Sequence, residues 1–246
     1  MSKKIYSNSP ILEAVCEFRL PSDTEWDMTI PGQLFESLKS EYPHKEQRQM
    51  QEIKVNVALE KEKSSQEIIT TERLLFRSED KIRLVQVSPN FLAVNVLKPY
   101  PNWEEFRPQI LQALEQLSKL IRINEFESVQ LQYVNRIEIP NDVTVLSKFF
   151  NIHPSFGTPL GHNVTNFGIF SGFKMHEERD NCNIQLYRQV SPSPTLEAVL
   201  LVLIYSLAKP KTVDFSSAGE WIEEAHTQIN QMFESCITDK LREKLY

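Results

Sequence analysis

Charged side chains spaced two residues apart are the first candidates for chemistry in this sequence. They fall in two segments, 11–20 and 129–139, in which polar and apolar residues alternate as in a half-buried β-strand. Opposite charges that face each other across a strand pair contribute up to about 1 kcal/mol. If the two strands are antiparallel neighbours, their charges form either an ion-pair ladder or a polar patch that binds a ligand or a partner. The residues concerned are Glu13, Glu17, Arg19, Arg136 and Glu138.

Two asparagines and a tyrosine close to these segments could hydrogen-bond a small ligand. Asn95 stands in an apolar segment that reads as a strand, and Asn135 lies between Tyr133 and Arg136. A pocket between sheet and helices near Asn95, Tyr133 and Arg136 would belong to a small-ligand binder or an enzyme. The structural alternative is that a buried asparagine satisfies backbone groups. The sequence leaves both open.

Motifs that carry known catalytic chemistry are missing from the sequence. The five histidines have no metal-ligand spacing with cysteine or carboxylate. A glycine-rich phosphate loop, a Gly-x-Ser-x-Gly elbow and a Cys-x-x-Cys pair are also missing. We therefore assign no catalytic residue, metal ligand or cofactor. Acids on different strands could still assemble a metal site, so a non-catalytic role is preferred without excluding an enzyme.

Composition indicates a globular protein of the reducing cytoplasm. Of 246 residues, 41% are apolar and 24% charged, which is ordinary for globular domains. No export signal is visible, and the longest apolar run, 196–208, is shorter than the roughly 20 residues of a membrane helix. Three widely separated cysteines favour free thiols. The net charge of −6 disfavours nucleic-acid binding, which depends on neutralising phosphates.

The segment 73–120 organises the predicted architecture. It reads as a meander of two or three strands followed by a helix that begins at Trp103, with Phe106 and Ile110 at helical spacing. Such a helix can lie back on the strands and bury one face of the sheet. The other predicted strands are 11–20, 53–59, 68–76, 129–139, 167–175, 183–189 and 196–207. The other predicted helices are 31–38, 221–237 and a short helix or turn near 143–150, with polar turns at 61–65 and 176–181.

This order of elements occurs twice, which predicts an internal duplication. The halves are 1–122 and 123–246, and each long helix begins near a tryptophan, Trp103 or Trp221. The predicted fold class is α+β. Two tandem β-α-β(3–4)-α repeats would form a largely antiparallel curved sheet with the long helices on its convex face. The two leading strands would then meet at a pseudo-two-fold axis.

Two resemblances accompany this prediction. The order β-α-β4-α, written twice, resembles the TATA-binding-protein type of fold, although basic, phenylalanine-rich strands for minor-groove binding are missing. At the level of sequence, the chain resembles a sporadically distributed prokaryotic family of uncharacterised proteins of about this length. That resemblance implies a prokaryotic cytoplasm but no particular activity. The segments that carry it are NSPILEAVCEFRL (8–20), LVQVSPNFLAVNVLKPYPNWEEF (84–106) and YVNRIEIP (133–140).

Together these observations predict a binding or scaffolding protein. Its open sheet face, or the exposed edge of the sheet, would contact a partner protein or a second copy. The sporadic distribution of the family fits an accessory role in a defence or mobile-element system. A small-ligand binder or enzyme is the alternative, and neither a membrane nor a nucleic acid is an expected partner.

Overall fold

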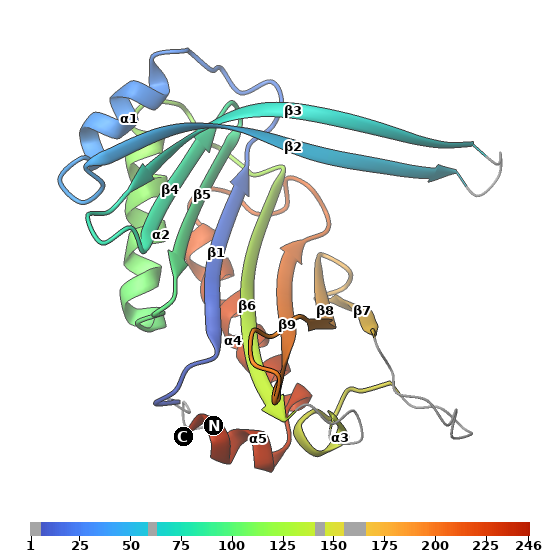
Figure 1. Cartoon of the computed structure of the whole chain (residues 1–246). Coiled ribbons are helices and arrows are strands. Elements are labelled where there is room, and N and C mark those ends of the chain that lie inside the picture. Colours follow the sequence, from blue (N-terminus) through green and yellow to red (C-terminus); the bar gives the residue numbers. More distant parts are fainter. Residues whose placement is uncertain (1–5, 59–62, 141–145, 155–165) are drawn as a thin grey trace.

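The computed structural model describes residues 6–58, 63–140, 146–154 and 166–246. Within these ranges it describes every side chain except those of residues 50–70. It is an α+β structure with a single nine-stranded sheet in which every described strand pair is antiparallel (Figure 1). The strands are β1 (Ile11–Arg19), β2 (His44–Ala58), β3 (Lys63–Arg77), β4 (Arg83–Ser88), β5 (Phe91–Leu97), β6 (Ser128–Pro140), β7 (Gly168–Met175), β8 (Asp180–Gln189) and β9 (Leu196–Leu207). The described helices are α1 (Ile30–Leu38), α2 (Trp103–Ser118), α3 (Leu146–Phe149), α4 (Ala218–Cys236) and α5 (Asp239–Leu245).

The first strand occupies the middle of the sheet. The strand order is β2-β3-β4-β5-β1-β6-β9-β8-β7, so β1 pairs with β5 on one side and with β6 on the other. Cys16 of β1 lies opposite Val94 of β5 and Leu131 of β6. The two leading strands therefore meet, and they pair antiparallel, which is the condition under which their charges were expected to face each other. A bulge between Ile11 and Glu13 shifts the register near the start of β1.

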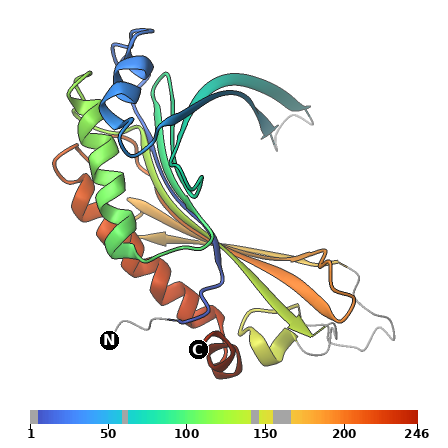
Figure 2. The same ribbon diagram turned by 60° about the vertical axis from the view of Figure 1, so that its left-hand side comes forward.

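One face of the sheet is covered by a layer of helices. Figure 2 shows α2 and α4 side by side on the convex face, with α1 at the upper end of α2. The sheet side of this core comes from alternate residues, because successive side chains of a strand point to opposite faces. In β1 these are Ala14, Cys16 and Phe18, each fully buried. None of the described helices is long and apolar enough to cross a lipid bilayer.

Helix α2 begins at Trp103, as its sequence predicts, whereas α4 begins at Ala218, three residues before the predicted Trp221. Asn102 caps α2, since its side-chain oxygen accepts the backbone N–H of Glu105 at 2.9 Å. Two acidic residues in the first turn, Glu104 and Glu105, also stabilise α2, because their negative charges lie at the positive end of the helix dipole. The inward faces of α2 and α4 then bury their apolar residues against the sheet. In α2 these residues are Trp103, Phe106, Ile110, Ala113, Leu114 and Leu117.

Some predicted boundaries are wrong. β2 begins at His44 rather than near Ile53, and it pairs with β3 in a hairpin of two 15-residue strands that projects far beyond the rest of the sheet (Figure 1). The segment 44–49 is polar throughout, so alternation gave no signal there. Helix α5 was also missed. Parts of the turn predicted at 61–65 and of the element near 143–150 lie outside the described residues.

Candidate functional site

The concave face of the sheet carries a row of registered residues across seven strands, and the side chain is polar in six of them. No described helix lies over the middle of this face (Figure 2). Apart from the buried Ala93 of β5, these residues are at least partly exposed, and most are uncharged, so they can both donate and accept hydrogen bonds. We call this set the polar row. From β4 to β7 it comprises Gln86, Ala93, Glu17, Gln130, Ser206, Asn181 and Lys174.

Next to the polar row, Asn95 joins three strands through its side chain. Its Nδ2 donates to Glu13 Oε1 at 2.6 Å, and its Oδ1 accepts from Gln86 Nε2 at 2.9 Å. Asn95 is buried, so the carboxylate and the amide together satisfy a side chain that would otherwise be costly to bury. The structure thus brings together two predicted site residues, Asn95 and Glu13. Gln86, the third member, was not predicted.

The charges of β1 and β6 do not form the expected cluster. Arg136 Nη1 pairs with Glu138 Oε1 of its own strand at 2.6 Å, whereas Glu17 lies opposite Gln130. The reason is the antiparallel register, which places Glu17 and Arg136 toward opposite ends of the strand pair. Glu13, opposite Val134, bonds Asn95 instead. The predicted cross-strand ladder between β1 and β6 is therefore wrong, although all five charged residues lie on the concave face.

Toward β3, an aromatic ring on the concave face is covered by arginines. The Arg73 guanidinium carbon lies 3.9 Å from the centre of the Phe91 ring, and that of Arg19 lies 5.2 Å away. Phe91 forms a small buried apolar cluster with Val15 and Ala93. Cation–π contact of this kind contributes about 0.5–2 kcal/mol. Of these residues, only Arg19 was a predicted site residue, and its position beside Phe91 follows from the pairing of β1 with β5.

Two other predicted residues face the helices rather than the concave surface. Asn135 is buried, and its Nδ2 donates to the backbone oxygen of Leu201 at 3.1 Å. It therefore satisfies a backbone group, as in the structural alternative, and does not face a ligand. Tyr133 is buried under α4. Asn95 and Arg136 are on the other side of the sheet, since strand residues of opposite parity point to opposite faces. The prediction of a pocket shared by Asn95, Tyr133 and Arg136 is therefore wrong.

Tyr133 belongs to a buried polar network that sequence reasoning missed. Its hydroxyl is 3.1 Å from both the Tyr100 hydroxyl and His226 Nδ1. His226 is stacked on the Trp103 indole, with ring centres 4.1 Å apart and planes 5° apart. Asn230 Nδ2 approaches the other ring nitrogen at 2.9 Å. Burial, followed by the neighbouring Tyr100, raises the pKa of Tyr133 well above its usual value.

A second buried network surrounds Asp180, whose side chain is inaccessible to solvent. One carboxylate oxygen accepts from the Trp221 indole at 3.0 Å, and the other accepts from the Tyr205 hydroxyl at 3.0 Å and from Arg179 Nη2 at 2.6 Å. Burial, followed by the Asp180 charge, raises the pKa of Tyr205. All donors are matched, so this carboxylate joins β8, β9 and α4 structurally. The sequence placed it in a polar turn.

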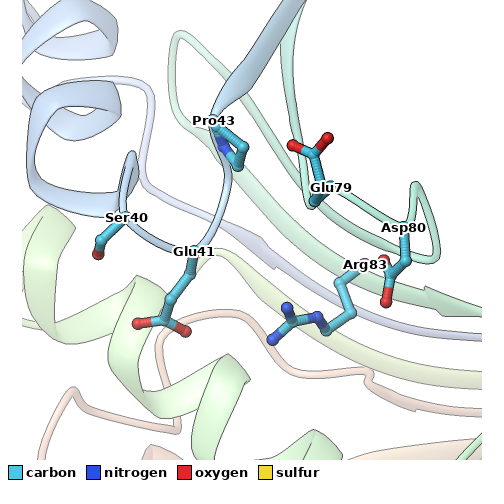
Figure 3. Close-up of a pocket in the computed structure, with 6 residues that line it drawn as sticks. All are labelled: Ser40, Glu41, Pro43, Glu79, Asp80 and Arg83. Atoms are coloured by element: carbon cyan, nitrogen blue, oxygen red, sulfur yellow. The ribbon is translucent and has the colours of Figure 1, made fainter.

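The hollow in Figure 3 lies where α1 meets β2, away from the predicted site residues. Arg83 and three carboxylates line it, together with Ser40 and Pro43. Ser78 and the backbone of Ile82 donate to Asp80, in that order of effect, and lower its pKa. The hollow opens broadly to solvent. Its carboxylates are those of Glu41, Glu79 and Asp80.

Comparisons with known proteins add no identity to these observations. Neither a scan against protein-family models nor a search of curated proteins yields a match. The prokaryotic family resemblance therefore stays a prediction. Within the described part of the chain, no three histidine, cysteine or acidic side chains are placed to hold a metal ion. The best-supported candidate for function is the concave face with its polar row.

Proposed function

We propose that the chain is a non-catalytic binding or scaffolding protein that holds a protein partner against the concave face of its sheet. The observation that carries this proposal is the polar row. A surface that spans seven strands and offers amides, a hydroxyl and one charge of each sign suits the mixed donors and acceptors of another polypeptide. Polyanions would instead need a continuous basic surface, which the row lacks.

The shape of the molecule supports the same proposal. The β2–β3 hairpin curves toward the concave side, so this face is recessed between the hairpin and the far strands (Figure 2). The Phe91 cluster with Arg73 stiffens the base of the hairpin. Toward β6, β8 and β9 the polar row is partly exposed. A partner would therefore contact Gln130, Asn181 and the Arg136–Glu138 pair.

We further propose the internal duplication, with halves 1–122 and 123–246. Outward from the central β1–β6 pair, the order is β5, β4, β3 on one side and β9, β8, β7 on the other. Each half has a long helix after its last strand, α2 or α4. The first half has β2 as an additional strand. A prokaryotic cytoplasmic setting and an accessory role in defence or mobile elements are proposed from the family resemblance alone.

The proposal is tested with a partner purified on the tagged chain and then titrated against variants. Gln130→Arg places a bulky charge in the polar row, and Arg136→Ala removes the neighbouring ion pair. We expect each to weaken binding about five-fold or more, as at energetically important interface positions. Lys119→Ala is the control, because it breaks an ion pair with Glu115 in the helix layer, although those side chains are more exposed than Arg136 and Glu138.

Circular dichroism spectra must match those of the unmodified chain before affinities are compared. Unchanged affinity for both Gln130→Arg and Arg136→Ala would overturn the proposal. A loss as large in Lys119→Ala would also overturn it, because the binding surface would then include the helix layer.

A further inference from the structure

The two edges of the sheet differ in how they discourage pairing with another strand. β2 forms one edge, and its segment 44–49 has the sequence HKEQRQ, whose charges protect an edge strand. β7 forms the other edge with the sequence GIFSGFKM, which has a single charge and no proline. Two phenylalanines of β7 are exposed, Phe170 by 70% and Phe173 by 50%. Among the described residues, no strand pairs with the outer side of β7.

The backbone of β7 defines which groups face outward. Arg188 N donates to Phe167 O, in register with the pairing of Gly168 and Tyr187. Hydrogen-bonded pairs alternate along an antiparallel ladder, so the odd-numbered residues of β7 bond β8. The N–H and C=O groups of the even-numbered residues therefore face the outer edge. These residues are Gly168, Phe170, Gly172 and Lys174.

We propose that a second copy of this chain occupies the β7 edge, pairing its own β7 antiparallel about a two-fold axis at Ser171. A two-fold axis perpendicular to the sheet puts the concave faces of both copies on the same side. Even-numbered residues of one β7 therefore lie opposite even-numbered residues of the other. In this register the outward N–H and C=O groups of Phe170 form hydrogen bonds with those of Gly172 in the second copy. The two nine-stranded sheets become one continuous sheet.

The side chains of β7 are complementary in this register. On the concave face, the large Phe170 lies opposite Gly172 of the second copy, which has no side chain to obstruct the ring. On the helix-facing side, Phe173 lies opposite Ile169 of the second copy, an aromatic–β-branched pair that stabilises sheets. Ser171 faces its own equivalent and can exchange a hydroxyl hydrogen bond. Shifting the axis by one residue to Gly172 would instead oppose Phe173 with Ser171 and lose this match.

The first test measures mass in solution by size-exclusion chromatography with light scattering. We expect the unmodified chain at twice its 28.7 kDa. Phe170→Pro removes an outward N–H and an exposed ring without touching the β8 ladder, and proline is tolerated on such an edge. We expect this variant to be a monomer. Met28→Ala is the control, because it removes another highly exposed apolar side chain, remote from β7.

The second test defines the register and does not depend on how Phe170→Pro folds. In the proposed pairing the two Ser171 residues form a non-hydrogen-bonded pair, whose Cα atoms lie about 4.5 Å apart, within reach of a disulfide. Ser171→Cys should therefore give a reducible covalent dimer under mild oxidation. Lys174→Cys should not, because its partner is Gly168 of the second copy and its neighbour in β8 is Asn181. The three native cysteines are buried and supply a low background.

Three results would overturn the inference. These are a monomeric unmodified chain with no Ser171→Cys dimer, a Phe170→Pro variant that remains dimeric, and equal cross-linking of Ser171→Cys and Lys174→Cys. The partner-binding proposal is tested separately, because Arg136→Ala leaves the β7 edge intact. We expect Arg136→Ala to retain the mass of the unmodified chain while its partner affinity falls.

Discussion

Two tryptophans near the beginnings of the two long helices are anchored in different ways. Trp221 of α4 donates its indole N–H to the buried Asp180 of the sheet beneath it. Trp103 of α2 donates to Glu223 of the neighbouring helix at 3.0 Å and stacks on His226, also of α4. The first anchor fixes α4 to β8 of the sheet. The second joins α2 to α4, so the two tryptophans have different structural roles.

The largest expected effect is at the Trp221 anchor. Asp180→Ala leaves the Trp221 and Tyr205 donors without their acceptor, and it leaves Arg179 with only the more distant Glu224 carboxylate, at 3.6 Å. Because breaking a buried ion pair typically costs about 3–5 kcal/mol, we expect the free energy of unfolding to fall by about that amount. Urea denaturation followed by circular dichroism measures it. Asp180→Asn, which keeps an acceptor, should lose less, and equal losses would contradict this account.

At the Trp103 anchor the expected loss is smaller. His226→Ala removes the stack on Trp103 and the hydrogen bonds to Tyr133 and Asn230, for a loss of about 2–3 kcal/mol. His226→Phe keeps the stack and should lose only the hydrogen-bond part. The same urea titration separates the two. If the alanine and phenylalanine variants are equally stable, stacking contributes nothing at this anchor.

The Trp103 anchor also contains a partly exposed carboxylate, for which a smaller change is expected. Glu223→Gln keeps an acceptor for the Trp103 indole but removes the ion pair with Arg107, so the free energy of unfolding should fall by less than about 1 kcal/mol. Glu223→Ala also removes the acceptor and should lose more. A loss for Glu223→Gln as large as that for Asp180→Ala would erase the difference between the anchors.

Tyrosine ionisation should not change the free energy of unfolding at neutral pH. In alkali it should lower this free energy through a tyrosine at each anchor. Tyr133 and Tyr205 have pKa values above the usual 10, mainly because they are buried. A folded-state pKa above the unfolded one gives stability that is complete below about pH 10 and is lost as pH rises toward the folded value. Phenolate absorbance should therefore appear together with unfolding. Tyr205→Phe should reduce this pH dependence, and phenolate absorbance from an intact fold would contradict the prediction.

Much of the fold could be predicted because its signals are local. Alternation in β1 and β6 gave the correct faces for Glu13, Cys16 and Arg136, and helical spacing gave the inward residues of α2. The polar beginning of β2 carried no such pattern, so its length was missed. The antiparallel sheet and α+β class followed from the order of elements, which the structure confirms at that level.

The candidate site was harder to predict because it depends on register between distant segments. Asn95 was singled out, but its partners Glu13 and Gln86 meet it only because β1 enters the sheet beside β5. The charges of β1 and β6 were expected to meet, whereas the antiparallel register puts Glu17 opposite Gln130 and away from Arg136. The buried roles of Asp180 and His226 likewise come from helix packing. A charged residue near a turn gives no local sign of such burial.

The central position of β1 has a consequence for how the chain is made. During synthesis β1 leaves the ribosome before the other strands. Of its two neighbours in the sheet, β5 begins only at Phe91 and β6 begins at Ser128. Contacts between such distant segments slow folding. The strand β1 is open on both sides until β5 has left the ribosome, and its β6 side stays open until more than half of the chain has emerged. A fragment that stops before β6 would retain that open side, a natural target for chaperones.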